Sequence, residues 1–225
     1  MSILEYEIIR SSRRTLALTV NKNGGIVVRA PMNMPESRIT AFVEEKQKWL
    51  EKHSSAAGAR SSRRAERLSQ PPHELPFLGE LYPVDHTQPY GYSEGRFHLP
   101  ENMPLESLLP MLKKLYSSLA RDTLPTRTRL TAERMGITLG EVKISSAKTR
   151  WGSCSADKNI NLSWKLMAAD MRLIDYVIVH ELCHIRQMNH SAAFWENVRA
   201  VIPDYEERRE CLKKVQETLS EYGLD

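Results

Sequence analysis

The sequence predicts an α+β fold in which a β-rich N-terminal region, residues 1–100, precedes a largely helical region, residues 101–225. Two observations carry this prediction. In the first hundred residues, short apolar stretches alternate with turn-forming glycine, proline and asparagine. Later segments mostly repeat apolar residues every three or four positions, the period of an amphipathic helix. A composition of 41% hydrophobic and 27% charged residues is typical of a folded globular chain.

The first elements expected are strands. Residues 4–30 contain several apolar stretches, and Asn-Gly-Gly at positions 23–25 separates the last two. Asn-Gly and Gly-Gly provide the positive φ angles that a hairpin turn needs. A helix is expected to follow between residues 35 and 50, and residues 76–99 to return to β structure.

Residues 53–72 are expected to form a mobile basic loop. They contain few large apolar residues and many serine, arginine, alanine and proline residues. Their arginines would suit an anion-binding arm, but a solvated tether is the simpler interpretation, and we adopt it.

Helices and two short strands are expected in the remainder. Leucine and tyrosine residues between 108 and 119 make one apolar stripe, and a second helical stretch ends at Gly136, a residue suited to a helix C-terminus. Residues 142–144 and 160–162 each alternate apolar and polar side chains, which predicts half-buried strands.

The helix expected over residues 171–184, with Asp170 as its N-cap, carries the strongest chemical signal. His180 and His184 are four positions apart and share a helix face, so both rings can present a nitrogen to one ion. Glu181 lies about 100° around the helix from His180. It can reach a water on that ion without displacing it, which is the chemistry of the His-Glu-x-x-His motif.

A catalytic zinc site generally has three protein ligands and one open position. His190, six residues after His184, is the expected third ligand, brought back by a left-handed turn at Asn189. The His-Glu-x-x-His-x5-His spacing matches metzincin proteases, but Gln187 stands where those proteins carry glycine. The competing third ligand would be a downstream carboxylate, from among Glu196, Glu206 and Glu207.

The chain is expected to be a soluble, cytoplasmic protein with no membrane partner. Its three cysteines, at positions 154, 183 and 211, imply no disulfide framework. Cys183 is interpreted as a small core residue rather than a nucleophile. Neither a signal peptide nor a run of about eighteen apolar residues is visible. The net charge of +4 does not establish nucleic-acid binding.

A family resemblance rests on several short runs in the C-terminal half: Arg150 to Ser155, Asp175 to Val177, His180 to His184, Asn189 to Ser191, and Phe194-Trp195. Over about residues 105–215 the chain resembles the YgjP-like metallopeptidase family, which is similar to SprT-like and WLM domain peptidases of the zincin class. The resemblance implies a zincin-like catalytic domain made of a helix, a small sheet, the motif helix and trailing helices. It also implies that His180, His184 and His190 bind metal and that Glu181 is the catalytic base.

The leading functional prediction is a metal-dependent hydrolase, a zinc metallopeptidase that acts on a peptide or protein through a metal-activated water. Nickel or another divalent transition metal would suit the same imidazoles. Arg150 and Trp151 are candidate substrate-binding residues.

Three alternatives stay open at this stage. One is a metal-dependent phosphohydrolase acting on a nucleoside triphosphate. Another is a non-catalytic binding module stabilised by its metal. The last is a protease that associates with nucleic acid, for which the basic segment 53–72 is the only local support.

Overall fold

The computed structural model describes residues 5–147 and 149–225, whose elements group into two units, Met1–Ser69 and Gln70–Asp225. Leu4, the first residue of the expected β region, lies outside the described residues. The structure divides after Ser69, whereas the sequence suggested a boundary near residue 100. Leu75 and Phe97, from the β segment before residue 100, are buried in the core of the second unit.

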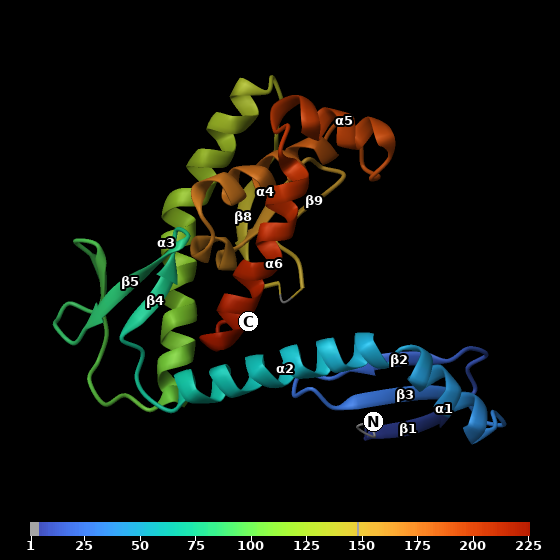
Figure 1. Cartoon of the computed structure of the whole chain (residues 1–225). Coiled ribbons are helices and arrows are strands. Elements are labelled where there is room, and N and C mark those ends of the chain that lie inside the picture. The colour runs from blue at the N-terminus through green and yellow to red at the C-terminus, as the bar shows by residue number, and fades with distance from the viewer. Residues whose placement is uncertain (1–4, 148) are drawn as a thin grey trace. The chain divides into compact units, whose positions relative to one another are not determined.

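The first unit is a three-stranded sheet with two helices (Figure 1). Its elements are β1 (Tyr6–Ser11), β2 (Ala17–Val20), β3 (Ile26–Pro31), α1 (Glu36–Glu45) and α2 (Gln47–Leu68). The central strand β3 pairs parallel with β1 and antiparallel with β2. Gly24, with a φ of 89°, forms the predicted hairpin turn. The core combines alternate β3 residues with apolar helix residues: Ile26, Val28, Ala30, Ile39, Val43 and Leu50.

The prediction of a mobile loop at residues 53–72 is wrong, because α2 continues to Leu68. Alanine and arginine, which are abundant there, are strong helix formers. Small side chains are needed on this helix because the hairpin turn packs directly on it. The Ser54 hydroxyl donates to the Gly24 carbonyl at 2.5 Å, and Ala57 is buried. The lack of large apolar residues thus reflects a helix that is mostly exposed and that meets the hairpin turn closely at Ser54 and Ala57, rather than a loop.

The second unit begins with a small sheet of strand order β4-β5-β7-β6. Its strands are β4 (Glu74–Phe77), β5 (Glu80–Asp85), β6 (Gly91–Ser93) and β7 (Arg96–His98), as the sequence predicted for residues 76–99. The turn between β4 and β5 reaches the segment before the motif helix. Leu78 N–H donates to the Met167 carbonyl at 2.8 Å, and Gly79 N–H donates to the Ala168 carbonyl at 3.3 Å.

The remaining elements occur in the order that the family resemblance implied: a helix, a small sheet, the motif helix and trailing helices. They are α3 (Leu105–Arg134), β8 (Val142–Ser145), β9 (Gly152–Cys154), β10 (Ile160–Ser163), the 3₁₀ turn η1 (Trp164–Ala168), α4 (Met171–His184), α5 (Ala192–Val201) and α6 (Tyr205–Glu221). The two helical stretches expected before Gly136 are one continuous helix. Gly136, with a φ of 62°, ends it as predicted.

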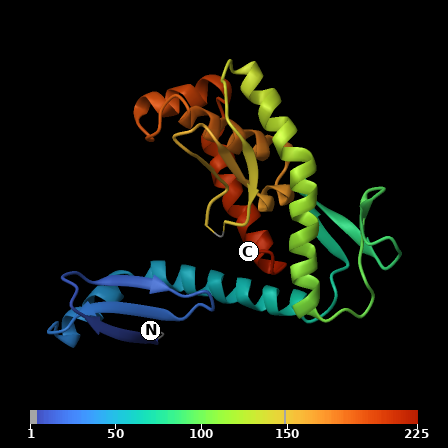
Figure 2. The same ribbon diagram turned by 180° about the vertical axis from the view of Figure 1, so that it is seen from behind.

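Helix α4 lies at the centre of the second unit. The sheet β8-β10-β9 packs on both α3 and α4 (Figure 2): β8 contacts α3, β9 and β10 contact α4, and the two helices also contact each other. Helices α5 and α6 also pack on α4. Apolar side chains of α4, among them Ile174, Ile178 and Leu182, are fully buried. Each contributes roughly 1.5–3 kcal/mol relative to exposure, so α4 is held firmly in place.

No helix in residues 5–147 or 149–225 combines the length and the apolar character needed to cross a bilayer.

Substitution Asp170→Ala is expected to lower the free energy of unfolding by about 1 kcal/mol, because it removes a helix N-cap. Asp170 Oδ1 accepts the Leu173 N–H at 2.9 Å, as the sequence predicted. Urea unfolding of both proteins measures the difference. Asp170→Asn, which keeps a capping oxygen, serves as the control, and equal losses in the two variants would contradict the capping role.

Candidate metal centre

Three histidines converge at the C-terminal end of α4. His180 and His184 are one helical turn apart, and their ring centroids are 5.0 Å apart. His190, from the segment between α4 and α5, brings its Nε2 to 3.2 Å from the Nε2 of His180. One potential ligand atom from each ring lies within 4.8 Å of the other two. Such a group could hold a metal ion.

The downstream carboxylates are not part of this group. Within the described chain, His180, His184 and His190 form the only cluster of metal-ligating side chains at this spacing. Glu206 instead accepts hydrogen bonds from Arg199 and from the Tyr205 hydroxyl. The geometry therefore favours His190 over a carboxylate as the third member.

The chain reaches His190 by a different turn from the one expected. Among the described residues, Asn189 is not one of those with positive φ, so the left-handed conformation predicted for it is wrong. Helix α4 ends at His184, and the Gln187 N–H still donates to the Cys183 carbonyl at 2.9 Å. Asn189 acts through its side chain, since its Oδ1 accepts the Ser191 N–H at 3.2 Å. This side-chain turn stabilises the return of His190.

The ring nitrogens are in a state that suits a divalent metal. Nδ1 of His184 lies 3.2 Å from the Gln187 carbonyl oxygen. Donation of its N–H to that oxygen leaves the lone pair on Nε2. Burial, together with the neighbouring His184 and His190, lowers the pKa of His180 to about 3. Neutral imidazole is the form that coordinates metal, so this donor set fits zinc or a similar ion.

Aromatic side chains of α5 pack against the three histidines. Phe194 stacks on His184 with ring centroids 4.5 Å apart, and Trp195 stacks on His190 at 5.6 Å. Trp195 is itself stacked on Tyr205 at 5.1 Å. The first turn of α5 therefore fixes two imidazole rings by stacking on their faces.

Glu181 is almost fully buried between α4 and strand β9, with 5% of its surface exposed. A Cβ atom on Gly152 would lie 2.6 Å from its Oε1 and 2.7 Å from its Cγ. Only glycine leaves room for the carboxylate at this point of the strand. Burial raises the pKa of Glu181 to about 7, although the charge of Arg150 opposes the rise. A carboxyl with such a pKa exchanges protons readily near neutral pH.

A pocket of about 660 Å³ opens beside these groups. His180, Glu181 and His190 line it together with Arg150 and Trp151, the two candidate substrate-binding residues. Both candidates therefore lie at the same site as the histidine group.

The same pocket contains two cationic residues that sequence reasoning missed, Arg209 and Lys213 of α6. The Arg209 guanidinium lies 5.6 Å from the centroid of the Trp195 ring. The two residues are four positions apart in the sequence, so they share one face of the helix. Nothing in the sequence indicates which element that face meets.

Cys183, inside the motif, is a core residue as predicted. It is fully buried, and burial raises the pKa of its thiol to about 11. The nucleophilic thiolate is therefore scarce at neutral pH, which argues against cysteine catalysis.

Comparison with known proteins gives one extensive match. The sequence model of the family described as "YgjP-like, metallopeptidase domain" matches residues 14–215. The solved metallopeptidase zymogen abylysin of Pyrococcus abyssi is 22% identical, with 39% of this chain and 89% of that chain covered and a TM-score of 0.36. The zymogen jannalysin of Methanocaldococcus jannaschii is 22% identical, with 39% and 90% covered and a TM-score of 0.35. No curated protein matches the sequence.

Purified protein is expected to bind one zinc ion per chain. Loss of a hydrogen bond to a metal ligand alone costs about 10- to 100-fold in affinity, so replacing any of the three histidines by alanine should cost more. Competition with a chromophoric chelator measures this affinity. His73→Ala, which removes an exposed histidine elsewhere in the second unit, is the matched control. Wild-type affinity in His190→Ala would exclude that residue as a ligand.

Proposed function

The chain belongs to the YgjP-like metallopeptidase family, and from this premise we propose that it is a zinc-dependent peptidase whose ion is held by His180, His184 and His190. Family membership supports a metal-dependent peptidase. The observation that carries the finer proposal is the convergence of three imidazoles beside the buried carboxylate of Glu181. Nickel or another divalent transition metal would satisfy the same ligands.

Glu181 is the proposed general base. A bound metal ion supplies Lewis acidity at oxygen and makes a water easier to deprotonate. Glu181 accepts a proton from the attacking water and delivers it to the nitrogen of the leaving amine. A pKa of about 7 suits both transfers, because the carboxylate can gain and lose the proton near neutral pH. The Gly152 backbone limits where this carboxylate can lie.

Arg150 and Trp151 are proposed to bind the substrate. Both line the pocket that contains His180 and Glu181. The indole of Trp151 offers an apolar wall, and the Arg150 guanidinium can donate two parallel hydrogen bonds to a carboxylate. A peptide or protein segment with an acidic group near the cleaved bond would meet both.

A second candidate function is hydrolysis of a nucleoside triphosphate at the same centre. Three cationic side chains, Arg150, Arg209 and Lys213, line the pocket. Cationic side chains around a cavity attract anionic substrates, and guanidinium groups bind phosphate in pairs of hydrogen bonds. The Glu181 carboxylate lines the same pocket, and Lys213 pairs with Glu210 at 2.6 Å, so the two arginines provide most of this attraction. This charge favours a polyanionic substrate independently of the peptidase chemistry.

A non-catalytic, metal-stabilised module fits the site less well. Structural zinc sites are usually closed by four protein ligands. Among the described residues the cluster has three members, and a titratable carboxylate lies beside them in an open pocket. These features support a catalytic centre.

Substitution Glu181→Gln is expected to reduce hydrolysis by about 100-fold or more, because it removes the proton acceptor. Wild-type and variant proteins loaded with zinc are assayed against a peptide library and against nucleoside triphosphates. Metal content is measured in parallel and should be equal. Loss of peptide cleavage supports the peptidase, and loss of triphosphate hydrolysis alone supports the second candidate. Survival of both activities in the variant would remove both reactions from this site.

Substitution Gly152→Ala is expected to lower kcat while zinc affinity stays within about threefold of wild type. Gly152 does not have a positive φ, so alanine adds no backbone strain, but its Cβ would push on the Glu181 carboxylate. Displacement of a catalytic group by about 1 Å can cost on the order of 100-fold in rate. Ser153→Ala on the same strand is the control. Unchanged kcat in Gly152→Ala would show that the position of Glu181 is not restricted by this strand.

A further inference from the structure

One cation beside the histidine group, Arg209 of α6, has no anionic partner. Within the described chain it makes no hydrogen bond and no ion pair. The next residue, Glu210, pairs instead with Lys213 at 2.6 Å. Both Arg209 and Lys213 line the pocket at the histidine group, so only one of these two α6 cations is neutralised by a carboxylate.

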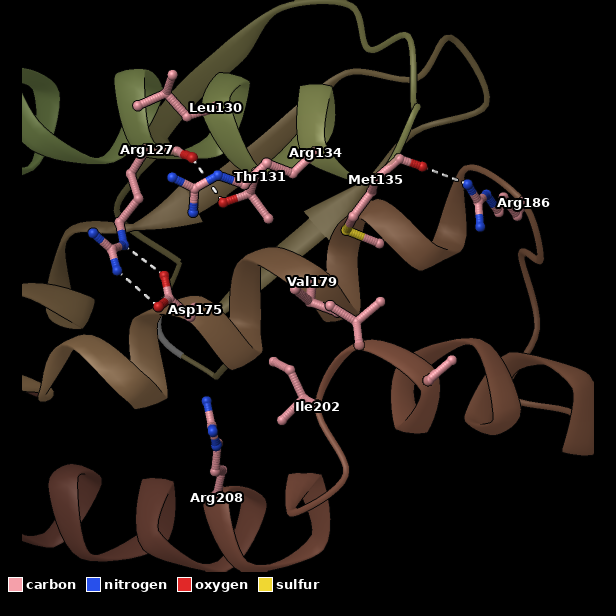
Figure 3. Close-up of a pocket in the computed structure, with 12 residues that line it drawn as sticks. Arg127, Leu130, Thr131, Arg134, Met135, Asp175, Val179, Arg186, Ile202 and Arg208 are labelled. Carbon is pink, nitrogen blue, oxygen red and sulfur yellow. Dashed lines mark hydrogen bonds and ion pairs between the residues drawn. The ribbon is translucent and has the colours of Figure 1, made fainter.

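Two arginines on a different side of α4 are partnered, in contrast. They line a second pocket, of about 510 Å³ (Figure 3). Arg127 forms a two-point ion pair with Asp175, in which Nη2 lies 2.7 Å from Oδ2. Arg186 donates from Nη2 to the Met135 carbonyl at 2.6 Å. A guanidinium that lacks such a partner keeps its N–H donors for a ligand.

An aromatic contact holds Arg209 beside the histidine group. Its guanidinium carbon lies 5.6 Å from the centroid of the Trp195 ring, and that ring stacks on His190 at 5.6 Å between centroids. Contact with an indole restrains a guanidinium without using its N–H donors. The charge also reaches the histidines: after burial and the other two histidines, Arg209 contributes to the low pKa of His180. Arg209 therefore has free donors in the pocket that contains these groups.

Arg209 suits a ligand carboxylate better than Arg150 does. Burial dominates the pKa of Glu181, and the charge of Arg150 opposes its effect, so Arg150 acts on the one carboxylate that lines the pocket. A ligand carboxylate at Arg150 would therefore lie near a like charge. Arg209 belongs to a different element, α6, and contacts an aromatic ring rather than an acid. Its planar group can donate two parallel hydrogen bonds to a carboxylate.

We propose that Arg209 determines substrate specificity by binding a carboxylate of the peptide, either an acidic side chain or the C-terminal group. This inference rests on the proposed peptidase function, and it names acidic peptides as the substrate class. The pocket of about 660 Å³ has room for a ligand side chain beside the reacting bond, since small-molecule sites typically occupy about 300–1,000 Å³.

Binding is measured by calorimetry on full-length, zinc-loaded protein that carries Glu181→Gln, so that peptides stay intact. One pair of peptides, blocked at both ends, differs by glutamate against glutamine. A second pair, free of acidic side chains, differs by a C-terminal carboxylate against an amide. The acidic member of at least one pair should bind about tenfold more tightly or better, the effect of a hydrogen-bonded charge pair. The pair that shows this preference identifies the source of the carboxylate.

The ion itself can attract a carboxylate, so the decisive quantity is the change in preference when Arg209 is replaced. Arg209→Ala should reduce the preference for the acidic peptide by about tenfold or more. Arg209→Glu should reverse it, because the substituted carboxylate repels the ligand, and a merely structural role would not produce a reversal. Lys214→Ala removes an exposed cation of α6 that does not line the pocket, and it should leave the preference unchanged.

An equal preference in the Arg209→Ala, Arg209→Glu and Lys214→Ala proteins would overturn the proposal, as would the absence of any preference before these substitutions. Loss of the preference in Arg150→Ala but not in Arg209→Ala would assign the carboxylate to Arg150 and overturn it too. Peptide cleavage is assayed separately with native Glu181. No cleavage together with an Arg209-dependent preference would refute the peptidase but not the carboxylate site. Cleavage without that preference would refute the carboxylate site alone.

Discussion

Glu181 can lie beside the histidine group only because strand β9 presents a glycine to α4. The side chain of Glu181 occupies the space that a Cβ at Gly152 would fill, at 2.6–2.9 Å from three of its atoms. This close approach sets the distance between helix and strand. It also removes the carboxylate from water, and that burial raises its pKa to about 7. One backbone contact thus restricts the position of the group proposed as general base and contributes to the burial that raises its pKa.

The histidines are held by different means. His180 and His184 belong to a helix whose other faces are buried, so the core of the second unit fixes them. His190 is exposed and belongs to no helix, and its position depends on the Asn189 side chain and on stacking with Trp195. Because Trp195 also stacks on Tyr205, packing of α5 against α6 reaches the histidine group. The third ring therefore depends on the tertiary structure far more than the first two.

Two pockets of the second unit have arginines in their lining, and α6 contributes to each. Arg208 lines one pocket, whereas the next residue, Arg209, and Lys213 line the other. Adjacent helix positions point about 100° apart, so one helix can supply charge to two separate hollows. The formal net charge of only +4 conceals this distribution. Electrostatic character at a site follows from where charges gather rather than from their sum.

Local patterns in the sequence were enough for the hairpin at Gly24, the cap at Asp170 and the common helix face of His180 and His184, because each depends on neighbours within a few residues. The spacing of the histidines and the family resemblance predicted His190 as the third ligand. Only the folded chain brings its Nε2 to 3.2 Å from the Nε2 of His180. Three features depended on the tertiary structure: the helical state of residues 53–68, the division after Ser69, and the cationic residues of α6 in the pocket. Each is decided by contacts between segments far apart in the chain, and no local period encodes such contacts.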